Sequence, residues 1–224
     1  MKDVLIYDTT LRDGCQAEDI SFTLEDKLRI AAKLVEVGID YIEGGYPGSN
    51  ARDADFFKEV KRLRLKKTRI AAFGTTRKPG THAAKDPSIR LLLEADTPVV
   101  TLVGKTWDLH VREDLRISKK ENLKMIADSI AFMKKKVDEV IFDAEHFFDG
   151  YLSNPQYALE CLKAAEEGGA DWAVLCDTNG GGMPGDIRSA IERVKSVIRT
   201  PLGIHCHNDG ERSEERRVGK ECRL

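Results

Sequence analysis

Short apolar runs alternate with helical patterns along most of this chain, with a period of about 30 residues, the length of a strand–helix–strand unit. The apolar runs predict buried strands at residues 4–7, 39–43, 69–73, 99–103, 140–143, 172–176 and 202–206. The patterns between them predict helices at residues 24–35, 53–65, 86–95, 118–136, 155–168 and 186–197. Seven strands joined in this way are expected to be parallel, because each connection holds a crossover helix.

This alternation predicts an α/β protein, for which two architectures are open. A (β/α)8 TIM barrel builds one site from a ring of loops, whereas a doubly wound open sheet concentrates its site at a switch point. Polar clusters follow at least five of the predicted strands, which favours the barrel. A complete barrel takes about 250 residues. We therefore expect a barrel that is truncated after strand seven.

The last residues differ from the rest of the chain. Residues 212–224 have no apolar periodicity, and residues 212–222 (RSEERRVGKEC) resemble the translation of a sequencing adapter. Such segments are excluded from reasoning about a fold. We therefore expect residues 1–211 to be an incomplete catalytic barrel domain and residues 212–224 to be an artefactual tail.

Charge and composition limit the classes of partner. The chain has 36 Lys and Arg against 38 Asp and Glu, a net charge of -2, so neither a nucleic-acid partner nor a membrane partner is expected. No apolar run reaches the roughly 18 residues of a membrane span, and the first residues do not resemble a signal peptide. The five cysteines include no CxxC pair, which is typical of reduced thiols. We expect a cytoplasmic protein.

The first polar cluster follows the first predicted strand, between Asp8 and Gln16. Arg12 offers a fixed positive charge that suits a carboxylate or a developing enolate. Asp13, beside it, could ligate a metal ion. The same residues would also suit a loop that caps a helix, so this cluster alone leaves both roles open.

The second cluster ends the seventh predicted strand, where one residue separates His205 from His207. Side chains alternate along a strand, so both imidazoles point to one face and can chelate one ion. With Asp13 they supply one carboxylate and two imidazoles, which suits Zn, Mn, Co or Mg with open positions for substrate and water. Two histidines with a purely structural role are the alternative.

A third cluster follows the fifth and sixth predicted strands. Glu145 is a candidate acid or base, and Thr178 could donate a hydrogen bond to a substrate carboxylate. Helix capping is the alternative role for Thr178 and for Asp177. Residues 180–185 fit the G-x-G-x-x-G spacing, but Pro184 interrupts it and no acidic residue lies about 20 residues further on. We interpret that segment as a tight loop at the barrel mouth.

Longer motifs contain these clusters. They are YDTTLRDGCQ at 7–16, IEGGYPGSN at 42–50, DAEHFFDG at 143–150, CDTNGG at 176–181 and GIHCHND at 203–209. They resemble the 2-isopropylmalate/homocitrate/citramalate synthase family, and the resemblance covers essentially all of residues 1–211. Members of that family are metal-dependent barrel enzymes that join acetyl-CoA to a 2-oxo acid. The second and third motifs are most similar to the (R)-citramalate synthase branch, which uses pyruvate and serves isoleucine biosynthesis.

The resemblance implies roles for the residues that match the family's motifs. A divalent metal ion (Mg, Mn, Zn or Co) would be held by Asp13 and the two histidines. Arg12 would steady the keto oxygen and the developing negative charge. Glu145 would lie by the methyl group of acetyl-CoA or by its water, and Thr178 by the carboxylate of the 2-oxo acid.

The resemblance also leads us to expect further residues around the substrates. These are Gln16, Glu43 and His110, together with Phe73, Leu102 and Asp143 from the ends of strands three to five, which would size the 2-oxo acid pocket. The full-length form is expected to be a homodimer, with groups from a C-terminal subdomain assisting proton transfer. The alternatives are a 2-isopropylmalate or homocitrate synthase, a hydroxymethylglutaryl-CoA lyase-like enzyme, and an inactive truncated fragment.

Overall fold

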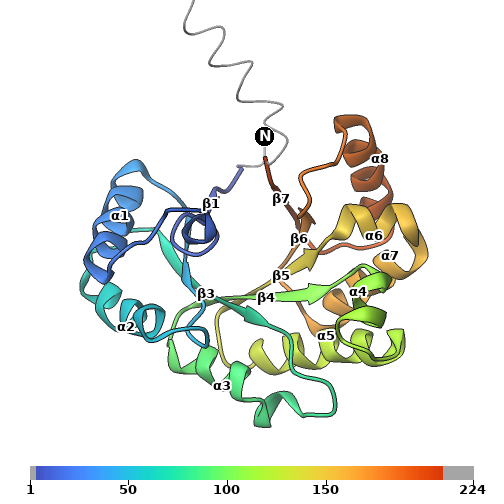
Figure 1. Ribbon diagram of the computed structural model, residues 1–224, viewed down its shortest axis with the longest axis horizontal. Helices are drawn as coiled ribbons and strands as arrows, with labels where there is room; N and C mark the ends of the chain where they lie inside the picture. Colours follow the sequence, from blue (N-terminus) through green and yellow to red (C-terminus); the bar gives the residue numbers. More distant parts are fainter. Residues whose placement is uncertain (1–3, 209–224) are drawn as a thin grey trace, which may run out of the picture.

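The computed structural model describes residues 4–208 as one curved parallel sheet with helices outside it. Its strands are β1 (Tyr7–Asp8), β2 (Tyr41–Gly45), β3 (Arg69–Thr75), β4 (Val99–Lys105), β5 (Glu139–Glu145), β6 (Trp172–Asp177) and β7 (Leu202–Cys206). They lie in chain order, and each neighbouring pair is parallel. Figure 1 shows the sheet curling into an open barrel. The predicted (β/α)8 architecture is therefore confirmed, with seven of its strands described.

The helices connect successive strands along the outside of the barrel. They are α1 (Leu24–Val37), α2 (Ala51–Glu59), α3 (Pro87–Glu94), α4 (Asp108–Glu113), α5 (Lys119–Met133), α6 (Phe147–Ser153), α7 (Pro155–Gly168) and α8 (Pro184–Lys195). Three 3-10 turns lie in the connections, η1 (Gly14–Gln16), η2 (Val60–Arg62) and η3 (Ala83–Lys85). The helix expected at 53–65 is divided into α2 and η2. The sequence did not predict α4 and α6, because six or seven residues are too few for a periodic pattern.

Local signals explain where the long helices begin and end. The Thr23 hydroxyl accepts the N–H of Asp26 at 3.1 Å, and the Asp26 carboxylate accepts the N–H of Thr23 at 2.9 Å, which forms a capping box for α1. Gly38 ends α1 with a φ of 91°, a conformation that glycine adopts without a steric penalty. At the start of α7, Asn154 caps the helix and Pro155 takes the first position.

Strand β1 is shorter than the predicted strand at 4–7. The Ile6 carbonyl still accepts the N–H of Tyr41 at 3.0 Å, and the Ile6 N–H donates to Asp40 at 2.8 Å. Val4 is 88% exposed, because β1 lies at one end of the sheet and pairs only with β2 among residues 4–208. An apolar run at a sheet edge therefore forms a shorter strand than the same run would form inside the sheet.

Two apolar layers lie on opposite sides of the sheet. The larger layer fills the space between strands and helices, and Leu102 and Phe142 belong to it. The smaller layer lies inside the barrel and contains Tyr41, Val99 and Ile141. Side chains alternate along each strand, so the residues two positions beyond this inner layer also point to the barrel axis. At that level they are mainly polar.

The amino ends of the strands are closed by a polar cluster around Glu139. Its carboxylate accepts the Tyr41 hydroxyl at 3.0 Å and the indole N–H of Trp172 at 2.6 Å, and it pairs with Arg69. Four strands contribute to this cluster, so it ties the barrel together at that end. Functional groups of such barrels gather at the opposite, carboxyl ends of the strands.

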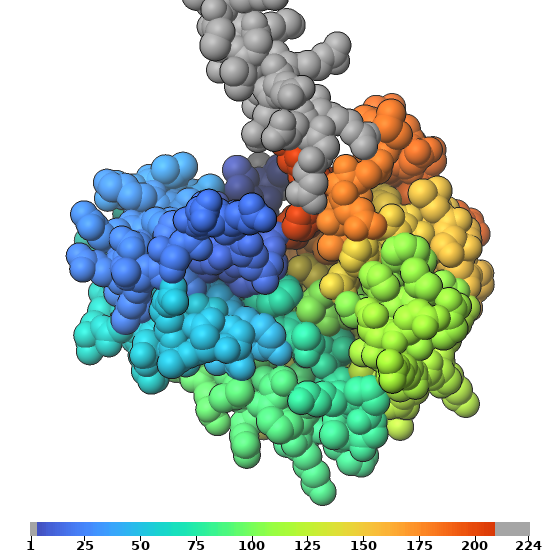
Figure 2. Space-filling model, in the orientation of Figure 1, coloured from blue at the N-terminus to red at the C-terminus, as the bar shows by residue number. Residues whose placement is uncertain are grey.

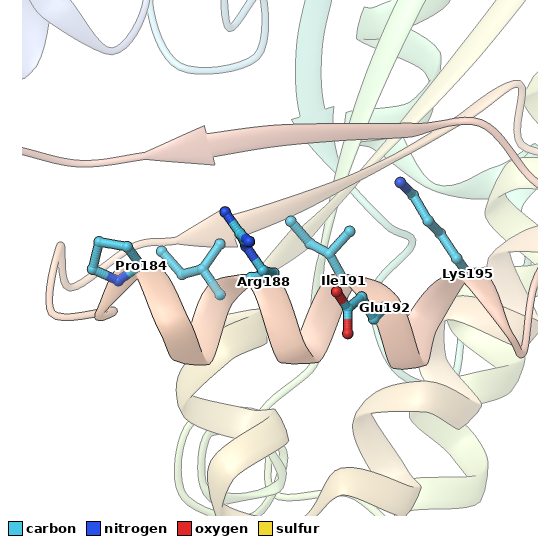
Figure 3. Close-up of a pocket in the computed structure, with 6 residues that line it drawn as sticks. Pro184, Arg188, Ile191, Glu192 and Lys195 are labelled. Atoms are coloured by element: carbon cyan, nitrogen blue, oxygen red, sulfur yellow. The ribbon is translucent and has the colours of Figure 1, made fainter.

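A groove runs along α8, on the side of the helix that is turned toward β7 (Figure 3). Ile187 and Ile191 line it beside Pro184, Arg188 and Lys195.

No helix within residues 4–208 has the length and apolar character needed to cross a membrane. The predicted boundary at residue 211 and the predicted tail at 212–224 lie outside the described residues.

Candidate metal and substrate site

Three potential metal ligands meet at the carboxyl ends of β1 and β7. The Asp13 Oδ2 atom lies 3.3 Å from Nε2 of His205 and 3.5 Å from Nε2 of His207. The two imidazole rings are stacked, with centroids 5.1 Å apart. Figure 2 shows the red β7 segment in the hollow between the blue start of the chain and the orange β6–α8 region. The ends of the described chain therefore come together at one site.

These three side chains fit a divalent cation. Two imidazole nitrogens and one carboxylate oxygen converge on a small volume and leave further positions for substrate or water. The hydrogen bond with His205 lowers the pKa of Asp13, and the same bond raises the pKa of His205. The carboxylate is thus held in its ionised form, which is the form that binds a metal ion.

Arg12 is fixed beside these ligands by three contacts. Its Nη1 donates to Oδ1 of Asp13 at 3.0 Å, and its Nε pairs with Glu43. The guanidinium lies over the ring of Phe73, with Cζ 4.0 Å from the centroid. The sequence predicted Arg12, Glu43 and Phe73 as site residues, and the structure brings all three together with Asp13.

Glu43 is fully buried and is bonded by Tyr7, which in turn contacts Thr101; neither Tyr7 nor Thr101 was predicted from the sequence. The Tyr7 hydroxyl donates to Oε1 of Glu43 at 2.8 Å and lies 2.6 Å from the Thr101 hydroxyl. Burial raises the pKa of Glu43, and the charge of Arg12 offsets part of that rise. Tyr7 lay within a predicted apolar strand, so only its position on the inner face could have indicated this role.

Asp143 lies on the inner face of β5, as expected for a pocket residue. It is 7% exposed, and burial followed by repulsion from Glu43 raises its pKa to about 7. Its carboxylate lies near Cys176 and His205, with one ligand atom of each residue within 4.8 Å of the others. Cys176 was not predicted, because a single cysteine in an apolar strand carries no local signal of function.

Glu145 and Thr178 lie at the ends of neighbouring strands on the rim of the barrel. The Glu145 carboxylate pairs with Lys105 at 2.7 Å, across the β4–β5 register. The Thr178 hydroxyl accepts the backbone N–H of His146 at 2.9 Å, which links the loops after β5 and β6. None of the contacts found within residues 4–208 joins Glu145 directly to Asp13 or its histidines.

His110 lies in a cluster with two other rings rather than with the metal ligands. Its ring centroid is 4.6 Å from that of His146 and 4.9 Å from that of Trp107. Burial and the nearby His146 and Lys105 lower the pKa of His110, so its imidazole tends to be neutral. Its buried Nδ1 atom has no hydrogen-bond partner among residues 4–208.

One predicted residue, Leu102, lies elsewhere than expected. Leu102 belongs to the core between strands and helices, so it does not line the barrel interior; alternation places Thr101 and Val103 on the inner face instead. Gln16 is exposed at the end of η1. An apolar run that is buried on both faces does not reveal which residues face the axis, which explains the error at Leu102.

The glycine-rich segment after β6 folds back on Asp177. The Asp177 carboxylate accepts the N–H groups of Gly181 at 3.2 Å and Gly182 at 2.9 Å. A short loop closed on its own carboxylate agrees with the tight loop expected at the barrel mouth. Asp177 thus holds this loop in place, which is a structural role.

Known proteins resemble this chain in sequence and in fold. The (R)-citramalate synthase of Geobacter sulfurreducens is 56% identical over 211 residues, which are 94% of this chain and 40% of that protein. The (R)-citramalate synthase of Aquifex aeolicus is 54% identical over 209 residues, 93% of this chain and 40% of that protein. The crystal structure of HMG-CoA lyase from Bacillus subtilis gives a TM-score of 0.76 at 19% identity, covering 97% of this chain and 73% of that one. That last likeness concerns the fold alone.

The comparisons agree on the family to which the barrel is assigned. The chain spans about two fifths of the length of these curated relatives, since the matches cover 40% of each. A family model described as HMGL-like matches residues 3–211, which include every predicted site residue. The chain therefore belongs to the HMGL-like family.

Proposed function

We propose that this chain is the catalytic barrel of a condensing enzyme that joins acetyl-CoA to a 2-oxo acid. Pyruvate is the proposed 2-oxo acid, and (R)-citramalate and CoA are the products, as a step of isoleucine biosynthesis. The observation that carries the proposal is the convergence of Asp13, His205 and His207 beside Arg12. The identity of 56% to an (R)-citramalate synthase favours this substrate pair.

Arg12 and Thr178 are the proposed anchors for the 2-oxo acid. The guanidinium of Arg12 is already oriented by Asp13, Glu43 and Phe73, so it can receive the keto oxygen without a further ordering cost. The Thr178 hydroxyl accepts one hydrogen bond and keeps its own proton to donate to the carboxylate. A divalent ion held by the three ligands would supply Lewis acidity, which polarises a keto group.

The chemistry then proceeds by carbon–carbon bond formation and hydrolysis. A base removes a proton from the methyl group of acetyl-CoA, and the resulting enolate carbon attacks the keto carbon of pyruvate. Arg12 balances the negative charge that develops on the keto oxygen. Water then cleaves the thioester, so acetyl-CoA, pyruvate and water give citramalate and CoA. Glu145, held at the rim by Lys105, is proposed to lie by the methyl group or by this water.

The pocket for the 2-oxo acid is proposed to be small. Phe73 and Asp143 border it on the inner face of the barrel, with Val103 in the position expected for Leu102. His110 and Gln16 are proposed to lie further out, toward acetyl-CoA. Because the relatives are more than twice as long as this chain, we propose that the remaining part completes the site, and that the full-length protein is a homodimer.

The test is release of CoA thiol by the full-length protein. Resequencing the gene beyond codon 211 gives the reading frame from which that protein is expressed. Thiol release with acetyl-CoA only when pyruvate is present would support the proposal. Release with 2-oxoisovalerate or 2-oxoglutarate in place of pyruvate would assign a 2-isopropylmalate or homocitrate synthase instead. Cleavage of hydroxymethylglutaryl-CoA without any 2-oxo acid would overturn condensation in favour of a lyase. The 224-residue chain, assayed in parallel, reports whether the barrel alone is active.

A further inference from the structure

A second set of potential metal ligands lies beside the first. Asp143 on β5, Cys176 on β6 and His205 on β7 each offer one ligand atom, and these atoms all lie within 4.8 Å of one another. His205 is common to both sets. The second set contains a thiol, which the first set lacks. Its other two members, Asp143 and His205, lie on β5 and β7, the strands on either side of β6.

The strand register explains why these side chains meet. Cys176 is the direct partner of His205 in the β6–β7 pair, and Asp143 is the partner of Val174 in the β5–β6 pair. Val174 and Cys176 are two residues apart, so they point to the same face of β6. Val174 packs against the inner core with Ile141, and Cys176 therefore points to the barrel axis one layer above it.

Burial distinguishes this set from a chance group of surface residues. Asp143 is 7% exposed and Cys176 is 6% exposed. None of the side-chain hydrogen bonds within residues 4–208 involves the Asp143 carboxylate. The Cys176 thiol has only a weak contact, with the Val174 carbonyl at 3.8 Å. Both groups thus have ligand atoms available to a cation.

We propose that Asp143, Cys176 and His205 form a second site, overlapping the first at His205, for a thiophilic divalent ion such as Zn²⁺. Carboxylate, thiolate and imidazole are the three ligand types that zinc takes in proteins, and three protein ligands leave one position open. On binding, the thiol releases its proton to solvent and the sulfur donates an electron pair to the ion. Because His205 serves both sets, a thiophilic ion here competes with any ion that Asp13 holds.

This proposal does not rest on the proposed reaction. It concerns which ions the barrel binds, and it holds whichever acyl or 2-oxo substrate the protein uses. It predicts that Mg²⁺ and Mn²⁺ bind at the Asp13 set alone, whereas ions that favour sulfur bind at the Cys176 set as well.

The test is a titration of the metal-free 224-residue chain with Co²⁺, a spectroscopic probe for Zn²⁺. Coordination by Cys176 should give a thiolate-to-cobalt charge-transfer band in the near ultraviolet. The Cys176→Ser variant should lose the band. The Asp143→Asn variant should bind Co²⁺ about tenfold or more weakly, as followed by the absorbance of the band. The Asp13→Asn variant should keep the band, since Asp13 is not in this set.

Matched thiols provide the control. Cys206 adjoins His205 in the chain but is exposed, so Cys206→Ser should keep the band, as should Cys15→Ser. Circular dichroism of each variant checks that it is folded. Absence of the band from the wild-type protein, or its persistence in folded Cys176→Ser, overturns the proposal. Loss of the band in Asp13→Asn likewise overturns it, because the thiol site would then depend on the first set.

Discussion

At the scale of single residues, Asp13 is the carboxylate on which His205 of β7 and His207, just beyond β7, converge. We expect Asp13→Asn to lower the affinity of the chain for Mn²⁺ by about tenfold or more, because a neutral amide replaces the charged ligand that hard cations prefer. Isothermal titration calorimetry of the metal-free protein measures this affinity. Asp19→Asn is the control, since Asp19 lies in the same loop, is exposed, and has a φ of 61° that asparagine also tolerates. Equal affinities for the wild type and Asp13→Asn would contradict the assignment.

At the scale of elements, Asp86 fixes the start of α3 and the loop before it. Its Oδ1 accepts the N–H of Ser88 at 2.8 Å, and its Oδ2 accepts the N–H of Lys78 at 2.7 Å. Burial alone would raise the pKa of Asp86, but these backbone hydrogen bonds outweigh it and lower the pKa. We expect Asp86→Ala to reduce the free energy of unfolding by about 1–2 kcal/mol near neutral pH.

The pH dependence of that loss follows from the direction of the pKa shift. The pKa of Asp86 is lower in the folded state, so its contribution is complete above the unfolded pKa of about 3.9 and is lost as the pH falls through the folded value. Urea denaturation of wild type and Asp86→Ala at several pH values should therefore show a difference that shrinks in acid. Glu94→Gln, at the exposed end of α3, should change stability by less than about 0.5 kcal/mol. A difference that is constant with pH would refute this account.

At the scale of the whole molecule, the two ends of the barrel have separate roles. Glu139 ties four strands at the amino ends, and the Asp13 ligands lie at the carboxyl ends. We expect Glu139→Gln to lower the free energy of unfolding by about 1–3 kcal/mol, because a buried donor then faces an amide N–H. The Mn²⁺ affinity of the folded variant should stay within about twofold of the wild type, since stability and function lie at opposite barrel faces. A fall in Mn²⁺ affinity of the folded variant well beyond twofold would contradict this separation and show that the two ends are coupled.

Much of the architecture was readable from the sequence. Seven apolar runs separated by capped helices predicted the strands and helices, because local periodicity and capping act over a few residues. The pair His205 and His207 was readable for the same reason, since alternation along one strand places both rings on one face. Arg12 and Asp13 stood out because they follow a predicted strand within a motif that resembles the family, although the cluster alone left a helix-capping role open.

Only the tertiary structure decided which side chains share the barrel axis. In β4 the residues Val99, Val100 and Leu102 are all fully buried, so hydrophobicity does not distinguish the inner face from the outer one. Curvature of the sheet brings β1 and β7 together, which places Asp13 against histidines from the far end of the chain. The meeting of Cys176 with Asp143 depends on register between strands, a long-range property that no local pattern in the sequence records.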